Sequence, residues 1–138
     1  MTIKCYENNV FTHDGQSDVA NFITEIEQYG ELKTALEATE NFTVYSGFHG
    51  YGYNDTMGPQ GSFKEAFSEA ENTQVSNAAK AMEEKYPVKI EVEIISSKDE
   101  LKNLNISELI SNGNVFFTWC DSDAYIKGLM GKDMPAKA

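Results

Sequence analysis

The sequence predicts a single α/β domain, a three-layer sandwich whose central sheet is mainly parallel. Stretches typical of strands alternate with stretches typical of helices along the 138 residues. Residues 42–48 and 115–119 are apolar on both faces, as interior strands of a covered parallel sheet must be. Residues 88–95 alternate instead, and place Lys89, Glu91 and Glu93 on one face, which favours an edge position. We therefore expect strands 42–48 and 115–119 to be central and adjacent.

Local signals predict the first half of the chain in order. Residues 1–16 predict a small hairpin around Asn8 and Asn9, a pair that tolerates left-handed turn geometry. Ser17 is expected to cap a helix whose apolar positions are spaced by three and four residues. His13 is expected to be a turn residue. Residues 49–61, with four glycines and a proline, are expected to form a loop.

The second half is predicted to hold a long helix, a strand, a shorter helical region and the last strand. Ser62 is expected to cap the long helix, and Pro87 to end it. Ser97 and Glu100 resemble a capping box for helices over 98–112. The domain is assigned to residues 1–138, with a frayed tail over 130–138.

Composition excludes several classes of function. Eleven basic and 22 acidic residues give a net charge of −11, which repels phosphate backbones and argues against nucleic-acid binding. No apolar run is long enough for a membrane span, and the N-terminus lacks the pattern of a classical signal peptide, so we expect a cytoplasmic protein or one exported without such a peptide. Two cysteines and two histidines provide no metal-site spacing, and no cofactor is expected.

Two corners of the predicted fold, each at the end of an apolar strand, carry residues that could take part in catalysis. The stretch "VYSGFHGYG" (44–52) ends an apolar strand at His49, and "NVFFTWCDSD" (114–123) ends another at Cys120. Carboxyl ends of parallel strands open on one side of a sheet, where α/β folds bind ligands. A histidine that takes the thiol proton, with backbone N–H donors for an oxyanion, would make an acyl-transfer site. Gly50 is the candidate donor.

These stretches resemble the paired signatures of caspase-like (clan CD) cysteine hydrolases, in which one apolar strand ends in His-Gly and a later one ends in Cys. Within that group they are similar to the bacterial Stv domain, an adhesin-type domain, through "SGFHG", "GPQGSF" and "GNVFFTWC" over about residues 42–121. The resemblance implies a hydrolase of peptide or amide bonds with His49 as base, Cys120 as nucleophile and Gly50 as oxyanion donor. The substrate-binding candidates beside them are Tyr51, Tyr53, Asp55, Asp121 and Asp123.

A second hypothesis needs no catalysis. The −11 charge, the small size and the acidic faces predicted for the helices fit a non-enzymatic bacterial effector, decoy or inhibitor that binds a basic partner. Under both hypotheses the partner is a protein or peptide, and the sequence leaves the oligomeric state open.

Overall fold

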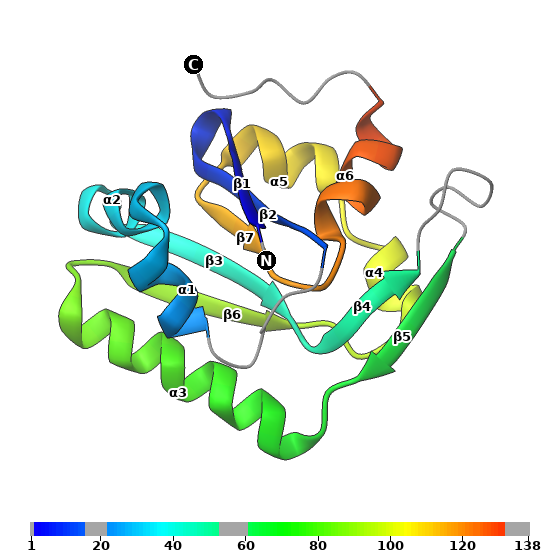
Figure 1. Cartoon of the computed structure of the whole chain (residues 1–138), viewed down its shortest axis with the longest axis horizontal. Coiled ribbons are helices and arrows are strands. Elements are labelled where there is room, and N and C mark those ends of the chain that lie inside the picture. The colour runs from blue at the N-terminus through cyan, green and yellow to red at the C-terminus, as the bar shows by residue number, and fades with distance from the viewer. Residues whose placement is uncertain (1, 16–21, 53–60, 132–138) are drawn as a thin grey trace.

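A five-stranded sheet of order β1-β2-β7-β3-β6 forms the centre of the molecule (Figure 1). The first pair of strands is antiparallel, and the other neighbours are parallel. The strands are β1 (Thr2–Tyr6), β2 (Val10–Asp14), β3 (Asn41–Ser46), β6 (Lys89–Ile94) and β7 (Val115–Phe117). The predicted α/β class with a mainly parallel sheet is confirmed.

The computed structural model describes residues 2–15, 22–52 and 61–131. The candidate residues Tyr53 and Asp55, the predicted cap Ser17 and the tail beyond residue 131 lie outside this part of the chain. No helix in the described part is long and apolar enough to cross a membrane. The helices are α1 (Phe22–Gln28), α2 (Gly30–Ala38), α3 (Glu69–Lys85), α4 (Lys98–Lys102), α5 (Ile106–Asn112) and α6 (Ser122–Met130).

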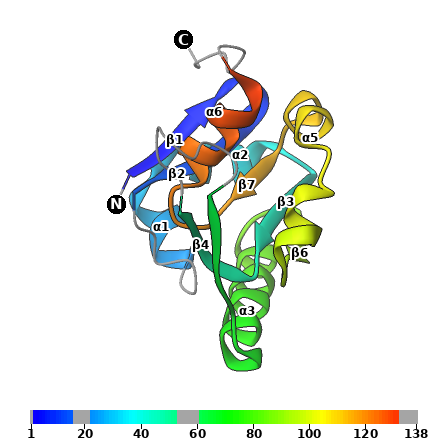
Figure 2. The same cartoon turned by 90° about the vertical axis from the view of Figure 1, so that its right-hand side faces the viewer.

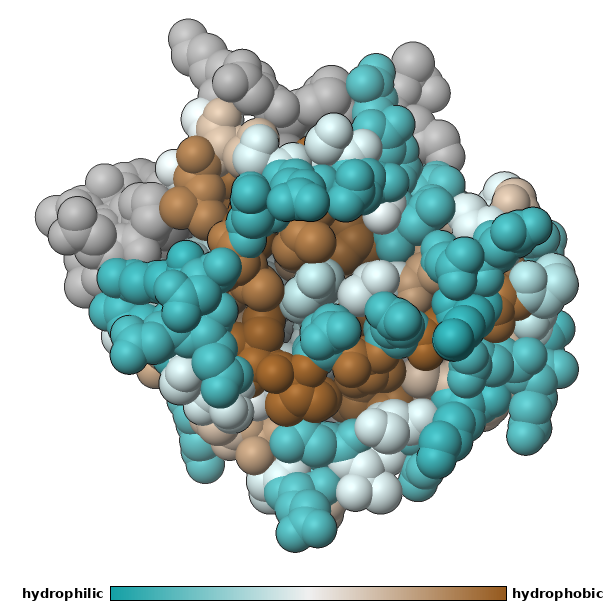
Figure 3. Space-filling model, turned by 180° about the vertical axis from the view of Figure 1, so that it is seen from behind, coloured by the Kyte–Doolittle hydropathy of each residue, from teal (hydrophilic) through white to brown (hydrophobic). Residues whose placement is uncertain are grey.

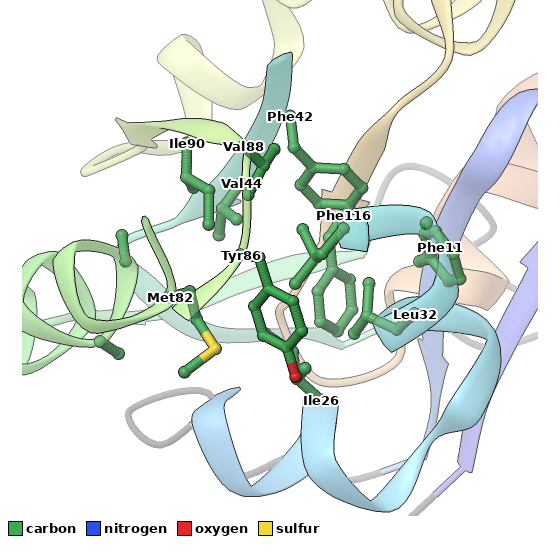
Figure 4. Close-up of a cluster of buried hydrophobic side chains, with 14 of the residues drawn as sticks. Phe11, Ile26, Leu32, Phe42, Val44, Met82, Tyr86, Val88, Ile90 and Phe116 are labelled. Atoms are coloured by element: carbon green, nitrogen blue, oxygen red, sulfur yellow. The ribbon is translucent and has the colours of Figure 1, made fainter. Parts of the chain in front are cut away.

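Helices cover both faces of the sheet because its central strands are apolar on both sides. On one face, α1, α2 and α3 enclose a cluster that contains Phe42, Val44 and Phe116 (Figure 4). On the other face, α4, α5 and α6 enclose a second cluster around Tyr45 and Phe117 (Figure 2). Alternate residues of the same strands thus supply two separate cores.

The order of the strands agrees with the prediction from their side chains. The first apolar stretch, β3, lies directly beside the second, β7, with Thr43 opposite Val115 and Tyr45 opposite Phe117. The alternating stretch forms β6, which among the described strands pairs with β3 alone and is an edge of the sheet. Parallel pairing of β3 and β7 brings the segments after both strands to the same end of the sheet, which decides where the two corners meet.

The prediction was wrong for residues 49–52 and 62–67, while residues 53–60 of the predicted loop lie outside the described part of the chain. Instead of a loop and the start of a helix, β4 (Phe48–Gly52) and β5 (Ser62–Ala66) form a two-stranded antiparallel sheet. The helix starts six residues later than Ser62, at a capping box in which Ser68 accepts from the Glu71 N–H and the Glu71 carboxylate accepts from the Ser68 N–H. Ser62 and Ser68 are each followed three residues later by a glutamate, as in a capping box. Only the pairing of β5 with β4 shows that the helix begins after Ser68 and not after Ser62.

The predicted hairpin turn is confirmed, and one helix was missed. Asn8 and Asn9 adopt φ values of 64° and 56°, in the left-handed region that asparagine tolerates. Helix α6 follows Cys120 directly and packs Tyr125 and Ile126 into the second core. Met130, predicted to begin the tail, is its last residue.

Candidate functional site

The two predicted corners meet through their main chains. Gly50 and Cys120 form an isolated parallel bridge. The Cys120 N–H donates to the His49 carbonyl at 3.3 Å, and the Tyr51 N–H donates to the Cys120 carbonyl at 3.4 Å. The strand adjacency that the acyl-transfer hypothesis requires is therefore present, but the Cys120 N–H is engaged by His49 itself.

Gly50 is the residue of β4 that faces Cys120 directly. A Cβ built on Gly50 would lie 2.8 Å from the Cys120 Cβ, so both positions face the same way. Strand β4 does not alternate regularly here, because Phe48 and Tyr51, three residues apart, both pack in the second core. The His49 carbonyl and the Tyr51 N–H both bond to Cys120, so the Gly50 N–H between them points toward β5, where Lys64 is its partner position. The expected oxyanion donor is therefore not aimed at Cys120.

The His49 ring lies over the start of α3. Its Nε2 is 3.1 Å from a carboxylate oxygen of Glu71, and its ring meets Phe67 edge-on with centroids 4.8 Å apart. The side chain of His49 is 45% exposed, so this pair is largely solvated. The pKa of Glu71 is lowered, first by the Ser68 N–H bond and then by the charge of His49. Glu71 orients the imidazole, a contact that the sequence did not suggest.

Cys120 lies beside an aspartate that holds a turn. Its Sγ is 3.6 Å from Asp121 Oδ2, and Asp121 Oδ1 accepts the Gly15 N–H at 3.0 Å. The Asp121 N–H returns a bond to the Gly15 carbonyl at 2.8 Å, and Asp121 adopts φ 58° at the start of α6. These bonds connect Asp121 to the end of β2, so one oxygen of its carboxylate is already used in a structural hydrogen bond.

Asp123, expected at the mouth of a substrate cleft, is instead buried, with 5% of its surface exposed. It accepts hydrogen bonds from the Tyr6 hydroxyl and from Thr12 Oγ1, and its second oxygen is 3.2 Å from Lys127 Nζ. Burial, followed by the bond to Asp123, raises the pKa of Tyr6 to about 12. This carboxylate joins α6 to the N-terminal hairpin, and the expectation that it contacts substrate is corrected.

Tyr51, also expected to line a cleft, is 1% exposed and packs in the second core. Its ring meets Tyr125 of α6 edge-on at 4.8 Å. Burial in a core stabilises the large aromatic ring of a tyrosine more than an exposed position in a loop does. Tyr51 therefore anchors β4 to α6.

The sequence also missed a buried ionisable pair. His13, predicted as a turn residue, is fully buried in β2, where its Nε2 contacts a Glu25 carboxylate oxygen. Its Nδ1 is 2.6 Å from the Thr118 carbonyl, just before Cys120. A glutamate on the apolar face of the helix predicted after Ser17 was the available signal, because a buried carboxylate needs a partner.

Two of the hollows among the described residues are an open groove and a smaller cavity. The open groove of about 480 Å³ lies between α4, α5 and α6, and Figure 3 shows the apolar surface on this side of the molecule. Its apolar lining comes from Leu101, Leu104, Ile106, Tyr125, Leu129 and Met130. The smaller cavity of about 160 Å³ lies beside Glu25 and Tyr29. Neither one contains His49 or Cys120.

The described residues contain no group of three or more His, Cys, Asp and Glu side chains arranged to hold a metal ion. No protein-family model, no curated protein and no solved structure matches this chain. The caspase-like relationship therefore stays a prediction.

Proposed function

We propose that the protein is a non-catalytic, acidic interaction protein that binds a basic segment of another protein. The observation that supports this proposal is the exposed edge strand β6. Glu91 and Glu93 are both exposed there, and within the described residues neither one has an ion-pair partner. In a chain of net charge −11 these carboxylates favour a cationic partner.

The chemistry of the two corners supports the same proposal. The polar groups nearest Cys120 are used in bonds within the fold: its N–H binds His49, and the Asp121 carboxylate binds Gly15. The His49 imidazole contacts the Glu71 carboxylate, with Nε2 at 3.1 Å from a carboxylate oxygen. We infer that the corner serves to join β4 to the main sheet.

Charge reversal on two surfaces tests the proposal. The probe is a fluorescein-labelled peptide with the sequence Lys-Val-Lys-Val-Lys, and binding is measured by fluorescence anisotropy. Glu91→Lys combined with Glu93→Lys should abolish binding. The control Glu7→Lys combined with Glu37→Lys changes the net charge equally at exposed positions remote from β6 in the sequence, and should weaken binding only slightly. Wild-type affinity should fall steeply as NaCl rises to about 0.5 M, because salt screens exposed charges.

Equal losses of affinity in both double variants would show that only the total charge matters, and would overturn the assignment of the binding surface to β6. Binding that does not change with salt would overturn the electrostatic basis. A Glu-Val-Glu-Val-Glu peptide serves as the matched negative control, and its binding would also contradict the proposal.

A second candidate function is a caspase-like cysteine hydrolase with a three-layer sandwich fold. Two observations favour it: the main-chain contact of His49 with Cys120, and the Glu71 carboxylate that orients the His49 ring in the manner of a catalytic triad. For catalysis, the His49 imidazole must come within hydrogen-bond reach of the Cys120 thiol. An electrophilic peptide probe tests this candidate: labelling of Cys120 that requires both His49 and Glu71 supports it, and labelling indifferent to His49→Ala overturns it.

Gly50→Ala is unsuitable as a catalytic test here. The new Cβ would lie 2.8 Å from the Cys120 Cβ and 3.3 Å from the Cys120 carbonyl oxygen. The substitution would therefore separate the two segments whether or not the site is catalytic, so His49→Ala is the informative change.

A further inference from the structure

Within the part of the chain that the structure describes, the main chain of β6 is hydrogen-bonded to a neighbouring strand on one side only. The N–H groups of Lys89 and Ile95 donate toward β3, to the carbonyls of Glu40 and Ser46, each at 2.8 Å. N–H and C=O groups alternate sides along a strand. The groups of Ile90, Val92 and Ile94 therefore point away from the sheet.

Glutamate side chains occupy both ends of this outer edge. The Ile90 N–H donates to Glu83 Oε2 at 3.0 Å, and the Ser96 N–H donates to Glu100 Oε2 at 2.9 Å. Between them lie the outward N–H groups of Val92 and Ile94. The hydrogen bonds within the described part of the chain include none from these two groups. The edge thus has a short open window, bounded by a carboxylate at each end.

The two faces around this window differ in chemistry. On one face are the exposed carboxylates of Glu91 and Glu93, beside Thr43 and Tyr45 of β3. On the other face are Val92, which is half-buried, and Ile94, which is 39% exposed and is one of the few large apolar side chains on the surface. Glu83 and Glu100 add negative charge at the ends, and Lys89 is the single basic side chain of the strand.

We propose that β6 accepts an extended basic segment of a partner protein as a sixth strand of the sheet. The segment pairs its main chain with Val92 and Ile94 between the two glutamate caps, so it is about five residues long. Its lysine or arginine side chains lie over Glu91 and Glu93, and its alternate, apolar side chains lie against Val92 and Ile94. This inference rests on the proposed function and names the binding mode.

A second copy of the chain fits the window poorly. Twofold antiparallel pairing centred on Val92 would place Glu91 of one molecule opposite Glu93 of the other. Like charges directly opposite each other destabilise a strand pair. The same two glutamates that attract a basic segment thus disfavour self-association through this edge.

Backbone methylation of the probe tests strand addition separately from charge. Two versions of the Lys-Val-Lys-Val-Lys peptide are N-methylated at alternate amides. One version carries the methyl groups on the amides that face β6, and the other carries them on the amides that face away. Both versions keep every positive charge. The version methylated on the amides that face β6 should bind about tenfold more weakly, since two hydrogen bonds are lost. The other version should bind like the unmodified peptide.

Amide exchange on the protein gives the matching measurement. Saturating unmodified peptide should slow hydrogen exchange of the Val92 and Ile94 amides, and leave the capped amides of Ile90 and Ser96 nearly unchanged. Salt-sensitive binding that is equal for both methylated peptides would overturn strand addition while the proposed function stands. A wild-type protein that binds none of the peptides would overturn both. Protection of the two amides that rises with protein concentration alone would assign the edge to a second copy, and would also overturn the inference.

Discussion

Each of the two histidines is paired with a glutamate, and the two pairs differ in burial. His13 and Glu25 are both wholly buried between α1 and the sheet. The side chains of His49 and Glu71 are 45% and 31% exposed at the start of α3. The contact chemistry is the same, and the surroundings decide what it contributes. The buried pair is expected to support the fold, whereas the exposed pair is expected to contribute little to it.

Geometry also fixes the proton content of the buried pair. His13 Nδ1 faces the Thr118 carbonyl, which can only accept, so this nitrogen carries a proton. His13 Nε2 and Glu25 must then share one further proton. The pair is net neutral whether that proton resides on the ring or on the carboxyl group, which makes its burial tolerable. Both partners are needed for this balance.

Removal of one partner from the buried pair should have the largest effect. Glu25→Ala or His13→Ala is expected to lower the free energy of unfolding by about 3–5 kcal/mol, because it breaks a buried ion pair. Urea denaturation followed by circular dichroism measures the change. The double variant His13→Phe with Glu25→Leu should be destabilised less than either single variant, since no polar group is left unpaired. A loss below about 1 kcal/mol in the single variants would show that the pair is not structural.

The network around Asp123 should give the next largest effect. Tyr6→Phe deletes one hydrogen bond to a buried carboxylate and should cost about 1.5–3 kcal/mol. Thr12→Val, which removes the neighbouring 2.9 Å bond, is the matched comparison. If neither variant changes the urea midpoint, Asp123 is not held as the structure indicates.

Alkaline pH should destabilise the fold through its buried tyrosines. Burial is the main cause that raises the pKa values of Tyr6, Tyr29 and Tyr125 to about 12, from 10.0. The folded state therefore keeps protons that the unfolded state releases. Stability should be complete below pH 10 and should fall as the pH rises toward 12. Urea midpoints across this range provide the measurement, and a flat profile would contradict the burial of these hydroxyl groups.

The exposed pair should give the smallest effect. His49→Ala should change the free energy of unfolding by no more than about 0.5 kcal/mol, as expected for a solvated surface site. Ser68→Ala, which removes the cap of the same helix, should cost about 1 kcal/mol and serves as the comparison. A loss at His49 that exceeds the loss at Ser68 would mean that the exposed pair holds the fold after all.

Sequence patterns were sufficient for the sheet and insufficient for side-chain environments. The apolar runs 42–48 and 115–119 identified neighbouring central strands, and the alternation around Glu91 identified the edge. These features depend on burial of whole strands, which periodicity reports. His13 was misread because its burial depends on Glu25, a contact between separate elements that no local pattern contains.

The site shows the same limit. The pattern placed Cys120 beside the strand that ends at His49, and their main chains do meet. The main-chain contact alone does not fix the directions of the two side chains, because β4 does not alternate regularly: Phe48 and Tyr51 both pack in the second core. The burial of Asp123 likewise depends on α6. This helix begins after Asp121, which is in the left-handed conformation and makes no side-chain cap bond, and the sequence patterns did not predict it.

The reactivity of the Cys120 thiol is the most direct test of a non-catalytic corner. The rate of iodoacetamide alkylation is measured against pH in a Cys5→Ser background, with His49 present and with His49→Ala. A non-catalytic corner predicts an ordinary thiol profile with its midpoint near or above about 8.5, the same in both proteins. A midpoint well below this value that rises when His49 is removed would contradict it, and would establish Cys120 and His49 as an activated pair.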